Sequence, residues 1–216
     1  MDKDTITLDK QSSLFEEETI IKNKHTSLLD NLNFNIAIVG VFSSLTVVGG
    51  FLLAVVPNFE LFSLMIFLSG FLFGKKSGLL ITTISVIIFA FLNPMGASHI
   101  FLFGAQIISY LTLCLSGIII NTFLKEKEYY KPAEDLYIFQ VLLIFGGIGF
   151  VWTIFSDIFL TLGMYIPLVG IASEIIVPIL LAGIPFTIIH VISNTLLFIF
   201  VLPALIQICL KVIKLH

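Results

Sequence analysis

Ionisable and amide side chains are rare in the long apolar stretches of this sequence. Asp157 and His190 each lie inside such a stretch, with a threonine within one helical turn. Polar groups are costly in a lipid bilayer, so they usually face the interior of a helix bundle and mark a site or a pathway. We therefore consider nine residues as candidates for binding a small molecule: Asn58, Glu60, Asn93, His99, Gln106, Trp152, Asp157, His190 and Asn194.

The spacing of these residues predicts that they converge in the outer half of one helix bundle. His99 and Gln106 are seven residues apart and share a helical face, and His190 and Asn194 are four residues apart and share another. In such a pocket, Asp157 would anchor an amine or hydroxyl group. His190 and Asn194 would hydrogen-bond to heteroatoms of a ring, and Trp152 would stack on that ring.

Each candidate also has a structural interpretation that stays open at this point. Asn58 and Asn93 lie beside prolines, where asparagine often caps a turn. Asp157 could end a helix in interfacial water, and the amides of Gln106 and Asn194 could join neighbouring helices. His190 could simply bond to a neighbouring helix, and Trp152 could be a packing residue.

Catalytic and metal-binding patterns are weak in this chain. Ser98 stands directly beside His99, whereas a serine nucleophile needs a separately positioned base. The four histidines lack metal-ligand spacing, the two cysteines lie in apolar runs, and there is no phosphate-binding glycine loop. We therefore predict no catalytic residue, metal or cofactor. One alternative is an intramembrane enzyme in which Asp157 and His190 form an acid–base pair within hydrogen-bonding distance.

The distribution of lysine predicts the topology. Hydrophobic residues make up 58% of the chain and charged residues 12%, which excludes an ordinary soluble domain and a basic face for nucleic acid. All eleven basic residues are lysines. Six spans would put every lysine on one side of the membrane, as the positive-inside rule requires. We therefore predict an all-α integral membrane protein with six transmembrane helices and both termini in the cytoplasm.

The predicted organisation is a polar cytoplasmic segment over residues 1–33 and a membrane domain over residues 34–212. Proline and glycine mark two outer turns, at Pro57-Asn58 and at Asn93-Pro94-Met95-Gly96, and Gly74 begins an inner turn that contains Lys75 and Lys76. The apolar connection 164–181 contains two prolines and is expected to form an irregular cap over the outer mouth. The predicted spans are 34–56, 60–74, 78–93, 99–124, 137–163 and 182–210.

Small residues are frequent in the first predicted span. Such residues at intervals of four create a shallow groove in which another helix can approach closely. The groove could pack inside the bundle or against a partner subunit. The candidate partner-docking residues are Ala37, Gly40, Ser44, Gly50 and Ala54.

Several short motifs resemble the substrate-binding S components of energy-coupling factor (ECF) transporters. These are Pro57-Asn58-Phe59-Glu60-Leu61, the stretch from Phe67 to Gly74, Phe91-Leu92-Asn93-Pro94-Met95-Gly96, and Gly183-Ile184-Pro185-Phe186 followed by His190, Ser193, Asn194, Phe198 and Pro203. The resemblance covers residues 36–205 and is greatest to S components whose substrate is not assigned. It implies a plasma-membrane protein that captures a vitamin or similar micronutrient from outside. It also implies a transmembrane coupling subunit and two cytoplasmic ATPases as partners.

Substrate capture for an importer is thus the leading functional hypothesis. The coupling subunits of this family contact small residues on the first helix, which the groove on the first span would supply. Besides the intramembrane enzyme, the other alternative is a structural or assembly subunit of a membrane complex. That alternative predicts an apolar interior without a cavity.

Overall fold

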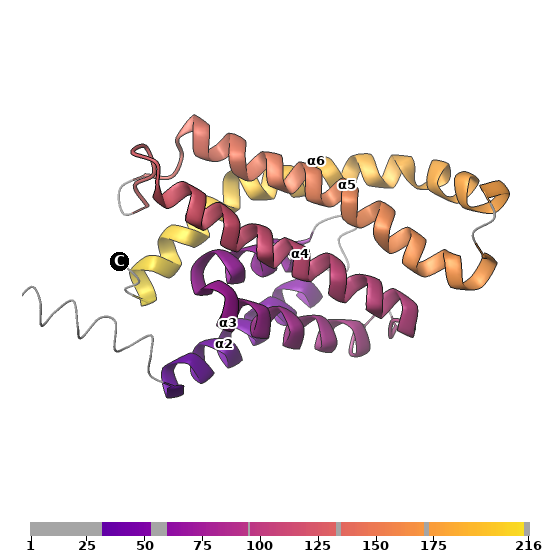
Figure 1. The fold of residues 1–216 in the computed structure, drawn as a ribbon, viewed down its shortest axis with the longest axis horizontal. Helices are drawn as coiled ribbons and strands as arrows, with labels where there is room; N and C mark the ends of the chain where they lie inside the picture. The colour runs from indigo at the N-terminus through magenta and orange to yellow at the C-terminus, as the bar shows by residue number, and fades with distance from the viewer. Residues whose placement is uncertain (1–31, 53–59, 95, 133–134, 171–172, 214–216) are drawn as a thin grey trace, which may run out of the picture. The chain divides into compact units, whose positions relative to one another are not determined.

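All regular structure in the described part of the chain is helical (Figure 1). The computed structural model describes residues 32–52, 60–94, 96–132, 135–170 and 173–213. Each of its five helices is long and apolar enough to cross a membrane. The prediction of an all-α, multi-pass membrane protein is therefore confirmed over these residues. The helices are α2 (Leu32–Leu52), α3 (Leu61–Phe91), α4 (Ile100–Lys125), α5 (Phe139–Val169) and α6 (Ser173–Ile213).

The chain divides into two compact units, Met1–Gly40 and Val41–His216. The described part of the first unit is the beginning of α2, in which Ala37 and Gly40 are exposed. The second unit contains the rest of α2 and all of α3 to α6. The buried apolar core and the polar residues discussed below all belong to the second unit.

Helix α3 consists of two arms that reverse direction at Gly74. This glycine has φ +69° and ψ −161°, a backbone conformation that side-chain-bearing residues rarely adopt. Ser69 Oγ lies 3.4 Å from Thr82 Oγ1, although thirteen residues of straight helix would separate them by about 20 Å. The turn predicted after Gly74 is thus present. The two short spans predicted over 60–74 and 78–93 correspond to the two arms of one element.

Helix α4 packs against the first arm of α3 at almost backbone-to-backbone distance. A Cβ atom on Gly70 would collide with the carbonyl oxygen of Cys114, and one on Gly117 would collide with that of Phe67. Only glycine permits this approach. On the same arm of α3, the ring of Phe67 lies 5.4 Å from that of Phe198 on α6. The close contact therefore extends into an aromatic cluster that joins α3, α5 and α6.

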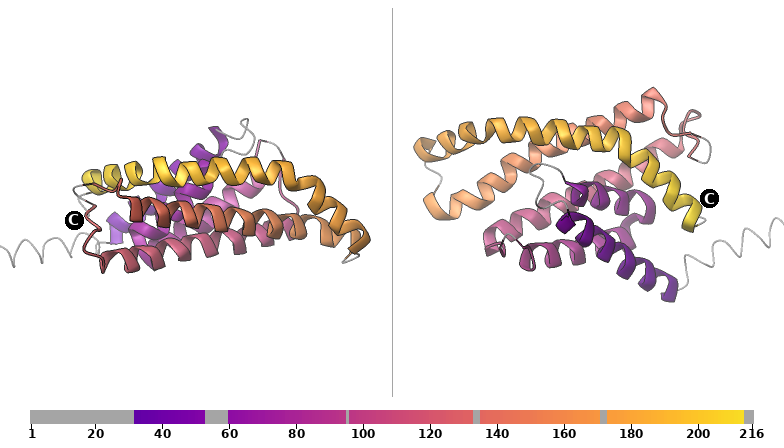
Figure 2. Two further views of the ribbon diagram at one scale, coloured as in Figure 1. Left: turned by 90° about the horizontal axis from the view of Figure 1, so that it is seen from above. Right: turned by 180° about the vertical axis from the view of Figure 1, so that it is seen from behind.

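Polar contacts show which helix ends lie together in the second unit. Asn121 Nδ2, near the end of α4, donates to the carbonyl oxygen of Phe71 at 2.6 Å, close to the reversal of α3. The Tyr137 hydroxyl, just before α5, donates to the carbonyl oxygen of Phe200 in the later half of α6. Figures 1 and 2 likewise show the α4–α5 connection and the end of α6 at one end, with the α5–α6 connection at the other. Within the described residues, the lysine-bearing segments of this unit therefore gather at one end.

The irregular cap predicted over 164–181 is wrong. Helix α5 continues to Val169 and α6 begins at Ser173, so the stretch is helical on both sides of Gly170. Helix α6 also contains three prolines, at positions 178, 185 and 203. Proline removes one backbone hydrogen bond, but membrane helices tolerate it. Helix α5 ends at Gly170, which has φ +74°. Helix α5 therefore continues beyond the C-terminal end of the predicted span 137–163, and α6 begins before the predicted span 182–210.

Candidate functional site

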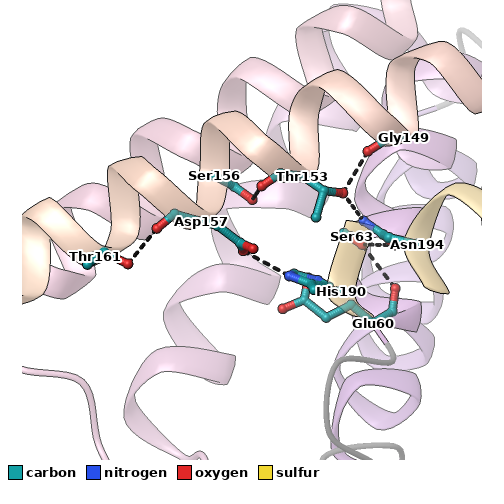
Figure 3. A network of polar contacts seen from close by, with 9 residues as sticks. All are labelled: Glu60, Ser63, Gly149, Thr153, Ser156, Asp157, Thr161, His190 and Asn194. Atoms are coloured by element: carbon teal, nitrogen blue, oxygen red, sulfur yellow. Dashed lines mark hydrogen bonds and ion pairs between the residues drawn. The ribbon is translucent and has the colours of Figure 1, made fainter. Parts of the chain in front are cut away.

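Two pairs of polar side chains face each other between α5 and α6 (Figure 3). On α5, Thr153 and Asp157 are four residues apart, and on α6, His190 and Asn194 have the same spacing. This spacing places both members of a pair on one helical face. His190 Nδ1 lies 2.8 Å from Asp157 Oδ1, and Asn194 Nδ2 donates to Thr153 Oγ1 at 2.7 Å. The matched spacing therefore lets two polar contacts form side by side.

The residue before α3 completes the group from a third direction. Glu60 Oε2 lies 3.8 Å from His190 Nε2, so the imidazole stands between two carboxylates. Ser63 in the first turn of α3 donates to the Glu60 carbonyl oxygen at 3.0 Å and lies 3.2 Å from Asn194 Oδ1. Residues far apart in the sequence thus join α3, α5 and α6 through one polar network (Figure 3).

The network is shielded from solvent but unequally so. Asn194 is fully buried, and His190 is 9% exposed. The side chains of Asp157 and Glu60 are 19% and 32% exposed. The exposed edge of the group is therefore made of carboxylates, and its buried side is made of the amide and hydroxyl groups that hold it in place.

Two cavities meet at Asp157. The first, of about 280 Å³, is lined by Asp157 and His190 together with Leu102 of α4 and residues of α5 and α6. The second, of about 260 Å³, is lined mainly by isoleucine and leucine from α5 and α6. Asp157, Thr161, Gly183 and Thr187 line both. The aspartate therefore faces a mixed cavity on one side and an aliphatic cavity on the other.

Two buried polar atoms in the network lack a hydrogen bond. Within the part of the chain that the structure describes, His190 Nε2 and Glu60 Oε2 are shielded and have no hydrogen-bond partner. Leaving a buried polar atom unsatisfied costs about 1–3 kcal/mol. A proton on the imidazole or a donor from a ligand would remove that cost. The arrangement can thus hold a proton, a hydrogen-bond donor or a positive charge.

Trp152 and Gln106 lie outside the lining of the two cavities. Trp152 Nε1 donates to the carbonyl oxygen of Ser109, and its ring lies 5.7 Å from that of Tyr110. Gln106 Oε1 is buried, with no hydrogen-bond partner among the described residues. Trp152 therefore joins α5 to α4, and its predicted stacking on a ligand ring has no support in the cavity linings.

His99 and Asn93 lie at the turn between α3 and α4, apart from the Asp157–His190 pair. His99 Nδ1 accepts a hydrogen bond from the backbone N–H of Leu102, and so caps the start of α4. The carbonyl oxygen of Asn93 accepts from Gly96 N–H in the turn that follows α3. Of the other candidates, Asn58 lies outside the described residues. The predicted site therefore converges only in part, on Glu60, Asp157, His190 and Asn194.

The predicted docking residues fall into three groups. Ala37, Gly40 and Ser44 are exposed on α2, whereas Ala54 lies outside the described residues. Gly50 is buried, and a Cβ atom there would lie 2.9 Å from the ring of Phe89. Gly50 serves packing within the second unit, because its missing side chain admits that ring. It offers no outward groove.

Sequence inspection missed Ser63 and Tyr110. Ser63 stands three residues after Glu60, which is the spacing of a first-turn contact, so the signal was present. Tyr110 is buried four residues after Gln106, with its ring 5.0 Å from that of Phe62. Nothing in the sequence distinguishes Tyr110 from the other aromatic residues of the chain.

Comparisons with known proteins leave this geometry as the main guide to function. No known protein family matches the sequence, and no curated protein or solved structure matches the chain significantly. Among the described residues, no group of three or more His, Cys, Asp or Glu side chains could hold a metal ion. The site is best described as a carboxylate–imidazole–carboxylate group in a helical membrane protein, in which Asp157 borders two cavities and His190 borders one of them.

Proposed function

We propose that this protein captures a small molecule within the membrane, as the S component of an ECF-type importer. The observation that carries the proposal is the polar network at Asp157, His190 and Glu60, which borders a cavity of about 280 Å³. A mostly apolar pocket with a few converging polar groups is the usual form of a small-molecule site. A subunit with only a structural role would not need such a pocket.

The proposal includes six spans with both termini in the cytoplasm. Support comes from α3, whose two arms reverse at Gly74, and from the lysine-bearing segments at one end of the second unit. The first arm and the second arm would each cross as a short span. With α2, α4, α5 and α6 this makes six crossings. The cavity at Asp157 would then open toward the outer side. The start of α5 follows a lysine-bearing connection, and Asp157 lies in the later part of the helix, far from that start.

A coupling subunit and two ATPases would complete the importer. The exposed small residues Ala37, Gly40 and Ser44 on α2 support a docking face for the coupling subunit. Small residues let helix backbones approach closely, which is how helices associate in membranes. The plasma membrane is the proposed location, since uptake from outside requires it.

Native mass spectrometry of the full chain, purified gently from cells grown in rich medium, tests capture directly. We expect a co-purifying small molecule that is released intact when the protein is unfolded. The matched variant Asp157→Asn should lose it while keeping the same helical content. If neither the purified protein nor the protein incubated with a metabolite extract retains any molecule, the capture function is wrong.

An intramembrane enzyme is the second candidate, favoured by one observation. Asp157 Oδ1 and His190 Nδ1 are 2.8 Å apart and line the same cavity, as an acid–base pair would. The chemical state of the bound molecule distinguishes the two functions. A molecule that is released unchanged after long incubation supports capture, whereas steady conversion to a product that stops in His190→Gln supports catalysis.

A further inference from the structure

The polar network between α5 and α6 carries an excess of negative charge. Glu60 and Asp157 contribute two carboxylates, and His190 can offset at most one of them. The sequence contains no lysine or arginine between residues 25 and 74, 77 and 124, or 132 and 210. Tyr110 on α4 can only add negative charge, and His99 uses its ring to cap α4. No cationic side chain from the spans themselves therefore completes the group.

The hydrogen-bond pattern points to a missing donor. When His190 Nδ1–H donates to Asp157 Oδ1, the ring is neutral and its Nε2 presents a lone pair toward Glu60 Oε2 at 3.8 Å. Two acceptors then face each other, both buried and both without a hydrogen-bond partner in the described part of the chain. Ammonium and amidinium groups combine N–H donors with a positive charge. Even a second proton on the imidazole would leave one carboxylate without a counter-charge.

The two cavities indicate the shape of the molecule that would supply this charge. Asp157 lies at the shared boundary, with the mixed cavity at His190 on one side. The aliphatic cavity on the other side is lined by residues such as Ile154, Ile158 and Ile184. A charged group at Asp157 would thus stand next to space suited to an apolar substituent.

We infer that the captured molecule is a small organic cation, an amine or amidine whose charged group pairs with Asp157 beside the Glu60–His190 pair and whose apolar part enters the aliphatic cavity. The inference rests on the proposed capture function and specifies its substrate class. A metal cation suits the site less well, because Asp157 Oδ1 and His190 Nδ1 contact each other and so cannot both face an ion. Among the described residues, no group of three side chains could serve as metal ligands.

A charge-sorted binding experiment tests the inference. A metabolite extract of rich growth medium is separated by ion exchange at pH 7 into cationic, neutral and anionic pools. The full-length protein is incubated with each pool, passed through gel filtration, and unfolded, and the retained small molecules are identified by mass spectrometry. We expect retention from the cationic pool, of an organic amine or amidine.

Three variants sharpen the result. Asp157→Asn and Glu60→Gln each remove one carboxylate of the network and should reduce retention of the cation at least tenfold. Glu174→Gln removes an exposed carboxylate at the start of α6, outside the network, and should leave retention unchanged. Thermal unfolding of each variant identifies any that fails to fold. If either Asp157→Asn or Glu60→Gln fails to fold, the other one decides the test.

The failures of the two proposals are distinguishable. Retention only from the neutral or anionic pool, or only of an inorganic ion, would overturn the organic cation and leave capture standing. Equal loss of retention in Glu174→Gln would also overturn it, because a general surface charge would then be responsible. Retention from none of the pools would overturn the capture function and this inference with it.

Discussion

The interface between α3 and α4 and the interface between α5 and α6 differ in how closely the helices pack. Between α3 and α4, Gly70 and Gly117 bring the backbones so close that a single added carbon atom would collide with a carbonyl group. Between α5 and α6, the part around Asp157 contains cavities, polar side chains and Gly183, where an added carbon atom would meet nothing within 4 Å. The α3–α4 interface excludes space, whereas the part of the α5–α6 interface around Asp157 and Gly183 keeps it.

This difference separates stability from function within one helical unit. Close packing gains dispersion contacts from every atom of the interface, and this is the main stabilising force between helices in a bilayer. A cavity gives up those contacts, and carboxylates that are partly shielded from water add a cost of their own. Since the α5–α6 interface accepts both costs, close packing alone does not explain its polar group. Four substitutions test this comparison, in order of decreasing effect.

His190→Leu should have the largest effect on stability. It removes the group between two carboxylates and leaves Asp157 partly buried without a partner. Breaking a buried ion pair from one side typically costs about 3–5 kcal/mol, and we expect a loss near the lower limit because Asp157 is partly exposed. SDS-induced unfolding of the protein in mixed micelles measures the loss.

The double variant His190→Leu/Asp157→Leu is the control. It removes both members of the pair, so most of the stability should return, because apolar replacements of buried ion pairs are often neutral. Ligand retention should not return with it. A double variant as unstable as the single one would mean that the pair holds the fold together, which would contradict its assignment to ligand binding.

Gly117→Ala should have an intermediate effect, at the opposite interface. The added methyl group must displace the backbone of α3 at Phe67, and overpacking of this kind costs about 1–3 kcal/mol. Gly104→Ala on the same helix is the matched control, since nothing lies within 4 Å of its added carbon atom. Gly104→Ala should be neutral or slightly stabilising in the same unfolding measurement. Equal losses in both variants would contradict the close approach of α3 and α4.

The sequence was sufficient to predict the helical class and most helix positions. A chain with long apolar stretches and few charges has no alternative to helices in a bilayer, because each backbone group must be hydrogen-bonded internally. The predicted span 99–124 agrees with α4, Ile100–Lys125. Gly74 was identified as a turn because proline and glycine are the residues that interrupt helices. The same rule failed at Pro167 and Pro178, which lie within helices.

The candidate site was predicted in part, for a physical reason. Helical spacing places His190 with Asn194 on one face, and it places Thr153 with Asp157 on another. Spacing cannot show which faces of different helices meet. Glu60, Asp157, His190 and Asn194 come together, whereas His99 caps α4 and Trp152 bonds to the backbone of α4. Rare polar residues in apolar helices thus identify candidates, and the helix packing selects among them.

The smallest expected effect comes from two asparagines, one at each interface, of which Asn194 is buried and Asn121 is half-buried. Asn121 donates to the carbonyl oxygen of Phe71 near the α3 reversal, and Asn194 donates to Thr153 beside the polar group. Side-chain hydrogen bonds between membrane helices contribute about 0.6 kcal/mol on average. We expect Asn121→Ala and Asn194→Ala each to lose about that much in the unfolding measurement.

Ligand retention should separate the two asparagine variants. Asn194 is bonded to Thr153 and lies 3.2 Å from Ser63 Oγ, so its loss frees the helices that position Asp157 and Glu60. Asn121 lies near the C-terminal end of α4, where it bonds to the carbonyl oxygen of Phe71. Among the described residues it forms no hydrogen bond with the polar network. Asn194→Ala should therefore weaken retention several-fold, and Asn121→Ala should not. If both variants weakened retention alike, affinity would follow overall stability, and the two interfaces would not have separate roles.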